Sequence, residues 1–162
     1  MLQPVRSYIG VGSNLQNPSA QVREAITCIS ALPVTALVKQ SALYESEPMG
    51  PPDQANYINA VVEIETTLSP LALLGKLNDI EEAFGRDRSV GHWGPRVIDL
   101  DILLYGQREL DLVRLRIPHP GLEQRAFVVL PLVEIAPQLV LPNGRELRQI
   151  AARFEPNSVK MR

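Results

Sequence analysis

The sequence predicts an α+β fold in which helices cover an antiparallel sheet. Apolar residues alternate along 57–67, as is typical of a strand. Segments at about 18–31 and 70–84 instead repeat apolar residues at helical spacing, each after a capping residue and a proline. The first six elements therefore follow the order strand, helix, strand, strand, helix, strand, which is the ferredoxin-like arrangement, here with a C-terminal extension. No repeat or linker divides the 162 residues, so we expect one domain over 1–162.

The first strand is predicted over Val5–Val11 and ends in Gly10-Val11-Gly12-Ser13-Asn14. This run lacks the third glycine of a dinucleotide-binding loop, so we interpret it as a tight turn that lets another segment or a ligand approach closely. Asn17 and Pro18 then begin the first helix as N-cap and first helical residue. The buried face of that helix is predicted from Val22, Ile26, Ile29 and Leu32.

The second and third strands are predicted over Val34–Glu45, which is rich in Val, Thr, Leu and Tyr, and over Tyr57–Thr67. A long loop over 46–56 separates them. Ser69-Pro70 caps the second helix. The apolar face of that helix comprises Leu73, Leu77, Ile80 and Phe84.

The sixth element is a strand over Val97–Leu104 with two acids in an otherwise apolar run. Because strand side chains alternate, Asp99 and Asp101 share one face, about 6–7 Å apart. The other face is predicted to present Ile98, Leu100, Ile102 and Leu104. Two neighbouring carboxylates repel unless a cation lies between them, and oxygen ligands suit a hard divalent ion. The alternative is that both acids lie on the solvated face of an edge strand.

The tail after the sixth element is less regular. Gly106-Gln107 predicts a turn into a hairpin over 108–117. Short helices are predicted within Leu122–Leu132 and Arg145–Phe154.

Composition excludes several classes of protein. The chain is 45% hydrophobic and 21% charged, which is ordinary for a globular protein, and its net charge of −2 does not favour a broad nucleic-acid surface. Cys28 is the single cysteine, so an intrachain disulfide and a cysteine-based zinc site are excluded. We see no signal peptide and no apolar run of the roughly 18–20 residues that span a bilayer. A cytoplasmic protein is expected.

The loop 85–96 combines three glycines with four groups able to be cationic, Arg86, Arg88, His92 and Arg96. Loop arginines are usually only solvated. Near an acid pair, however, they suit a phosphate-rich ligand, because the guanidinium binds phosphate oxygens bidentately, and the glycines suit a lid. A second basic group surrounds Pro118 and comprises Arg114, Arg116, His119 and Arg125.

Two aromatic residues and an amide form a further group. Tyr57 and Asn59 face the same side of their strand, and Phe127 follows in the tail. Aromatic residues in strands usually belong to the core. The alternative is that the two rings enclose a flat heterocycle while Asn59 hydrogen bonds to its edge.

Taken together, six ordered blocks resemble the 6-hydroxymethyl-7,8-dihydropterin pyrophosphokinase family of folate biosynthesis. The most specific block, Trp-Gly-Pro-Arg-x-x-Asp-Leu-Asp-Ile, runs from Trp93 to Ile102. The resemblance covers nearly the whole chain, and the family fold is ferredoxin-like. The remaining blocks are Gly12-Ser13-Asn14-Leu15, Tyr57-Ile58-Asn59-Ala60, Gly85-Arg86, Pro118-His119-Pro120 with Arg125-Ala126-Phe127, and Pro131-Leu132-x-Glu134-Ile135-Ala136-Pro137.

The resemblance implies that the chain transfers pyrophosphate from ATP to the hydroxymethyl oxygen of the pterin and releases AMP, with attack at the β-phosphorus. Asp99 and Asp101 would hold two Mg²⁺ ions that bridge the triphosphate, and Arg86 and Arg96 would act on the phosphates as catalytic residues. These residue types fit the reaction, because in-line phosphoryl transfer needs alignment and charge neutralisation more than covalent help. Trp93 would move with the closing loop.

The resemblance also implies two binding sites and a monomer that acts on ATP and the pterin, without nucleic acid or membrane. In the pterin site, aromatic stacking, an amide and backbone contacts would come from Ser46, Met49, Tyr57, Asn59 and Phe127. The nucleotide site would comprise Asn78, Glu81, Arg88, His92, Trp93, Arg96, Ile102, Arg114, His119 and Arg125.

Four positions depart from the family pattern. Ser89 replaces a lysine and His92 an arginine in the second loop, so we expect changes in nucleotide affinity and loop closure. Gly121 replaces an arginine found in many members, which removes one phosphate contact. Glu47 replaces a frequent proline, so the first loop is expected to be more mobile.

Two other readings remain open. The same element order occurs in RNA-binding domains of the RRM type, which would show exposed aromatics and a basic sheet face. A catalytically silent relative used as a scaffold would bind nucleotide without turnover, although the intact acid pair argues against it.

Overall fold

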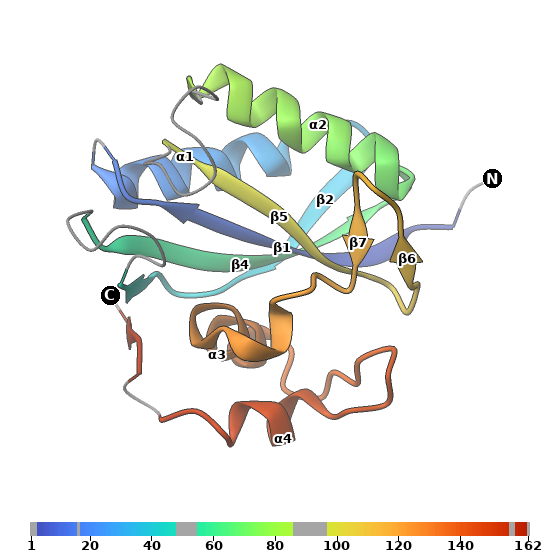
Figure 1. Ribbon diagram of the computed structural model, residues 1–162. Coiled ribbons are helices and arrows are strands. Elements are labelled where there is room, and N and C mark those ends of the chain that lie inside the picture. Colours follow the sequence, from blue (N-terminus) through green and yellow to red (C-terminus); the bar gives the residue numbers. More distant parts are fainter. Residues whose placement is uncertain (1–2, 16, 48–54, 86–96, 156–157, 162) are drawn as a thin grey trace.

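The computed structural model describes residues 3–15, 17–47, 55–85, 97–155 and 158–161. An antiparallel sheet forms its centre, and helices lie on both faces (Figure 1). None of the helices in these ranges has the length and apolar character needed to cross a membrane.

The main sheet follows the order β5-β1-β4-β3-β8, and β2 pairs with β4 beside β3. Its strands are β1 (Val5–Ser13), β2 (Thr35–Gln40), β3 (Tyr44–Ser46), β4 (Tyr57–Thr66), β5 (Asp99–Tyr105) and β8 (Lys160–Met161). The helices α1 (Pro18–Ser30) and α2 (Pro70–Ala83) lie on one face, and α3 (Ala126–Ile135) and α4 (Leu147–Ala151) lie on the other (Figure 1).

The caps of the first two helices differ from each other. The Ser69 hydroxyl accepts a hydrogen bond from the Ala72 N–H at 3.2 Å, so the predicted cap of α2 is confirmed. Asn17 occupies the N-cap position of α1 as predicted, but its side chain makes no capping hydrogen bond, and its backbone is left-handed with φ 62°. Asn17 therefore starts α1 through its tolerance of this backbone conformation.

The prediction of one strand over Val34–Glu45 was wrong, because the chain forms β2 and β3 with a break at 41–43. At the break the Ser41 hydroxyl accepts the Val61 N–H at 2.9 Å, in place of a backbone carbonyl. The Ala42 N–H instead donates to the carboxylate of Glu134 on α3, at 3.1 Å to each oxygen. A side chain remote in sequence therefore bends this strand and places Ser46, expected in a loop, within β3.

Each face of the sheet has its own core. On the α1 and α2 side, both helices bury the predicted faces against the sheet, including Val22, Ile29, Leu73 and Leu77. On the other side, α3 and α4 pack on the sheet through a cluster that includes Tyr8, Val61, Leu103, Leu104, Val129, Leu132 and Leu147. The C-terminal extension thus covers a sheet face that is otherwise exposed.

In the tail, the expected hairpin is present as β6 (Leu110–Asp111) and β7 (Arg116–Ile117). The short helices expected in the tail are also present. The 3₁₀ helix η2 (Leu122–Gln124) precedes α3, which continues past Leu132 to Ile135, and α4 lies within 145–154.

A bulge in β5 overturns one prediction about its faces. Tyr8 pairs with Leu104 and Ile9 with Ile102, so Leu103 is an extra residue between two paired positions. The alternation therefore shifts by one residue. Leu104 joins Leu103 in the cluster between the sheet and α3, instead of facing α1 and α2 with Leu100.

Candidate active site

The two acids of β5 lie beside glycines of β1. Asp99 pairs with Gly12 and Asp101 with Gly10, while the intervening Leu100 is buried against α1 and α2. This register confirms that both acids share the face opposite Leu100. Both glycines add no side chain to that face of β1, and a Cβ at Gly10 would lie 3.5 Å from the Leu103 Cδ2.

The absence of a side chain at Gly12 also allows the Asn59 side chain of β4 to approach closely. Gly12 pairs with Asn59 on its other side, and a Cβ at Gly12 would lie 3.1 Å from the Asn59 Oδ1 and 3.8 Å from the Tyr57 Cδ1. The prediction that these glycines allow close approach is therefore confirmed at Gly12. Asp99, Gly12 and Asn59 form one row across three adjacent strands.

The Asn59 amide is buried and oriented by β3. It is 6% exposed, and its Nδ2 donates to the Ser46 Oγ at 2.6 Å. Ser46 pairs with Tyr57, whose ring is half-buried at the start of β4. This pairing places three of the expected pterin residues, Ser46, Tyr57 and Asn59, side by side. The adjacent departure, Glu47, is exposed at the end of β3.

His119 reaches the acids from the tail of the chain. Its backbone N–H donates at 3.0 Å to the carbonyl of Leu103, the bulge residue of β5. The imidazole Nδ1 accepts the Gly121 N–H at 3.0 Å, so the neutral ring has its proton on Nε2, which lies 3.9 Å from the Asp101 Oδ1. Burial lowers the pKa of His119, and the nearby Arg125 charge lowers it further.

Arg125 folds back over the turn that follows His119. A Cβ at Gly121 would lie 2.6 Å from the Arg125 Nε, so the missing side chain at Gly121 is what makes room for this arginine. The Arg125 Cζ lies 5.9 Å from the centroid of the Phe127 ring, a cation–π arrangement. Phe127 itself is half-buried against the cluster between the sheet and α3.

The other expected nucleotide residues lie in different surroundings. Asn78 is half-buried on α2, and Arg114 is exposed in the turn between β6 and β7. The Ile102 side chain is buried under the helices, so a nucleotide contact there falls to its backbone. Glu81 is 3% exposed at the end of α2, and its Oε2 accepts the Leu100 N–H at 2.9 Å.

Several expected residues lie outside the described part of the chain. They are Met49, Arg86, Arg88, Ser89, His92, Trp93 and Arg96.

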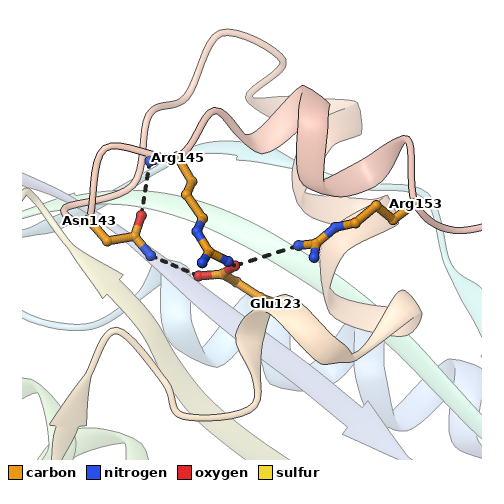
Figure 2. A network of polar contacts seen from close by, with 4 residues as sticks. All are labelled: Glu123, Asn143, Arg145 and Arg153. Carbon is orange, nitrogen blue, oxygen red and sulfur yellow. Dashed lines mark hydrogen bonds and ion pairs between the residues drawn. The ribbon is translucent and has the colours of Figure 1, made fainter.

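A polar network fixes the segment that bears His119 and Arg125 (Figure 2). Glu123 on η2 accepts from the Arg145 Nη1 at 2.7 Å and from the Asn143 Nδ2 at 2.9 Å, and the Arg153 Nη2 lies 3.6 Å away. The Asn143 Oδ1 also accepts the Arg145 N–H at 3.0 Å. Sequence reasoning missed this network, because Glu123 lies 20 positions from Asn143 and 22 from Arg145, and no local pattern links them.

A second set of polar contacts, centred on Glu134, joins α3 to β3 and the break before it. The Tyr44 hydroxyl donates to the Glu134 Oε1 at 2.7 Å, and burial, together with this carboxylate, raises the pKa of Tyr44. Glu134 also binds the Ala42 N–H, so one carboxylate positions the strand that carries Ser46. Glu134 belongs to one of the blocks that carry the family resemblance, but the sequence did not indicate that it binds Tyr44 and Ala42.

Among the described residues, no group of three or more His, Cys, Asp and Glu side chains is arranged to hold a metal ion. Asp99 and Asp101 provide two carboxylates as possible metal ligands, and the Asp101 side chain is 49% exposed. Magnesium commonly uses one or two carboxylates, with water and substrate phosphates as its other ligands. The donor set fits a magnesium site that a phosphate substrate completes.

The family model for 7,8-dihydro-6-hydroxymethylpterin-pyrophosphokinase (HPPK) matches residues 8–137. The chain belongs to the HPPK family. The match includes Gly12 and all the described residues predicted for the two binding sites, from Ser46 to Phe127.

Bacterial members of the HPPK family are similar along nearly their whole length. A 2-amino-4-hydroxy-6-hydroxymethyldihydropteridine pyrophosphokinase from Pseudomonas aeruginosa is 48% identical over 147 residues, covering 91% of this chain and 90% of its own. The Haemophilus influenzae protein of the same name is 48% identical over 150 residues, covering 93% of each chain.

The fold is shared with a crystal structure described as Plasmodium falciparum HPPK-DHPS wild type with pteroate. The TM-score is 0.76 at 13% identity, over 94% of this chain. This chain corresponds to 43% of the Plasmodium chain, so the likeness concerns one part of that longer protein.

Proposed function

We propose that this protein transfers pyrophosphate from ATP to the hydroxymethyl oxygen of 6-hydroxymethyl-7,8-dihydropterin and releases AMP, in folate biosynthesis. The observation that supports this function best is the single row formed by Asp99, Gly12 and Asn59. A carboxylate suited to a phosphate-bound metal ion and an amide suited to a heterocycle edge thus lie on the same face of the sheet, on the two strands that flank β1.

The pterin would lie over Gly12, between the rings of Tyr57 and Phe127. A flat ring can approach here because Gly12 adds no side chain beside Asn59. The Asn59 amide is already fixed by Ser46, so it is preorganised to hydrogen bond to the ring edge. Backbone contacts from Ser46 and Met49 complete the proposed pterin site.

Asp99 and Asp101 would bind two Mg²⁺ ions, and ATP is the co-substrate. When bound, divalent cations neutralise phosphate charge and align the attacking and leaving oxygens. The pair fits this task because both carboxylates face the same side, next to Gly12 and Gly10, which add no side chain there.

In the proposed reaction, the hydroxymethyl oxygen forms a bond to the β-phosphorus of ATP, and the bond from that phosphorus to the bridging oxygen of AMP breaks. The hydroxymethyl proton is released, and no side chain is assigned as its acceptor. His119 would contribute a neutral Nε2–H donor beside the phosphates, and Arg125 a fixed positive charge. Both residues would stabilise negative charge on the phosphate oxygens as it moves between them during the transfer.

The remaining expected ligands stay predictions. The nucleotide site would also include Asn78, Ile102 and Arg114. Within 86–96, catalytic roles are proposed for Arg86 and Arg96, and nucleotide contacts for Arg88, His92, Trp93 and Arg96. Ser89 and His92 would adjust nucleotide affinity.

At the level of the whole chain, we propose a single ferredoxin-like domain that acts as a monomer. The strand order β5-β1-β4-β3, with α1 and α2 on one face, supports this fold class. The cytoplasmic location expected from the sequence stays a prediction.

The deciding experiment incubates the protein with Mg²⁺, ATP and the reduced pterin and separates the nucleotides by chromatography. AMP formed in equal amount to pterin pyrophosphate supports the proposal. Release of ADP, or no turnover by folded protein, would contradict it. Nucleotide binding without turnover would favour a silent scaffold, and salt-dependent RNA binding would favour an RNA-binding domain.

A further inference from the structure

A buried carboxylate lies directly behind the acid pair. Glu81 lies in the last turn of α2 with 3% of its surface exposed, and its Oε2 accepts the Leu100 N–H at 2.9 Å. Burying a carboxylate is costly unless hydrogen bonds compensate, and a bond to a charged acceptor is stronger than a neutral one. This interaction is therefore a firm link between α2 and β5.

The position of the link in β5 is what makes it functionally important. Leu100 lies between Asp99 and Asp101, and β5 is the terminal strand of the sheet among the described residues. On the side away from β1, the Leu100 N–H is therefore satisfied by a side chain rather than by another strand. A rotation or slip of this short segment would move both carboxylates together.

Glu81 is poorly suited to contact the phosphates of a nucleotide. A buried carboxylate repels phosphate oxygens unless a cation lies between them. Glu81 also forms no group with Asp99 and Asp101 that could hold a metal ion, since the described residues contain no such group of three. Its carboxylate is directed to the backbone between the acids.

We propose that Glu81 is a positioning residue that fixes the Leu100 segment so that Asp99 and Asp101 present their carboxylates to a divalent cation. This inference rests on the proposed function for the divalent cation at Asp99 and Asp101 and for the identity of the reaction. It replaces direct nucleotide binding as the role of Glu81.

Three variants separate these roles. Glu81→Leu removes the acceptor at similar size, whereas Glu81→Gln keeps an oxygen that can accept the Leu100 N–H. Glu82→Gln is the matched control, since Glu82 is the exposed next residue of α2. The readouts are the Leu100 amide signal by NMR, binding of Mn²⁺ alone by electron paramagnetic resonance, and the KM for ATP at saturating Mg²⁺.

In Glu81→Leu we expect the Leu100 amide signal to shift, its hydrogen exchange to accelerate, and Mn²⁺ binding to weaken by about tenfold or more, with the KM for ATP within about threefold. Glu81→Gln and the control should keep Mn²⁺ binding within about threefold. Unchanged Mn²⁺ binding in Glu81→Leu would overturn the proposal. So would an equal rise in the KM for ATP in both Glu81 variants.

If Glu81→Leu does not fold, Glu81→Gln decides. Retained Mn²⁺ binding with a retained Leu100 hydrogen bond supports positioning, and about tenfold weaker Mn²⁺ binding with that bond intact contradicts it. The NMR and Mn²⁺ measurements need no turnover. Failure of the proposed function would instead appear as wild-type protein that forms no AMP.

Discussion

Replacing Gly12 by alanine tests whether this glycine shapes the pterin site. The added Cβ would lie 3.1 Å from the Asn59 Oδ1, closer than ordinary contact. Asn59 cannot easily yield, because its Nδ2 is bonded to the Ser46 Oγ at 2.6 Å and its side chain is buried. The amide must therefore rotate or lose that bond.

The magnitude follows from the hydrogen bonds at stake. A neutral hydrogen bond contributes about 1 kcal/mol net, and the Asn59 amide can make one or two with the pterin edge. Losing them would cost about 1–2 kcal/mol, which corresponds to roughly 5- to 30-fold weaker pterin binding. The effect should be confined to the pterin, because Gly12 pairs with Asn59 on one side and leaves the backbone of Asp99 in place on the other.

The assay compares KM values for pterin and ATP, with thermal unfolding as a check of the fold. We expect the KM for pterin to rise and the KM for ATP to change by less than about threefold. Gly75→Ala on α2 is the matched control, since nothing lies within 4 Å of its added Cβ and alanine favours a helix. An unchanged KM for pterin in folded Gly12→Ala would refute this account of the pocket.

Three further predictions concern the acids, the pH response and the arginine beside Gly121. Asp101→Ala should lower kcat by well over tenfold, more than about 1.4 kcal/mol on the barrier, with little change in the melting temperature; activity within about tenfold of wild type would argue against a metal-binding role. Burial, with the Glu63 charge as the next cause, raises the pKa of Tyr8 from 10.0 to about 12, so the unfolded chain releases this proton first and the free energy of unfolding should fall as pH rises from about 10 to about 12. Urea unfolding across that range should show a smaller fall in Tyr8→Phe than in wild type, and an equal fall would contradict the assignment. Gly121→Ala places a Cβ 2.6 Å from the Arg125 Nε, so Arg125 must move, and steady-state kinetics should show a higher KM for ATP; an unaltered KM would indicate that Arg125 does not contact the nucleotide.

Strand alternation allowed some of the site to be predicted from the sequence. The shared face of Asp99 and Asp101 follows from the two-residue period of a strand, and it is confirmed by their pairing with Gly12 and Gly10. The same rule failed at Leu104, because the bulge at Leu103 adds one residue and reverses every later position. A local period holds only until tertiary pairing interrupts it.

Contacts between distant segments could not be predicted in the same way. The break at Ser41 depends on the carboxylate of Glu134, and the position of His119 depends on the carbonyl of Leu103. No spacing or propensity in the sequence indicates these partners. They arise only when α3 and the tail pack on the second face of the sheet.

Apart from the break that separates β2 from β3, the sequence by itself determined the order of the first elements, the two helical faces, the acid pair and the glycine run, because each depends on neighbours a few residues apart. Only the tertiary structure decided that Gly12 separates Asp99 from Asn59, and that Glu81 binds the backbone between the acids. The physical reason is that hydrogen bonds and steric contacts between strands depend on register. Register is a property of the paired strands, so it is established only when the sheet forms.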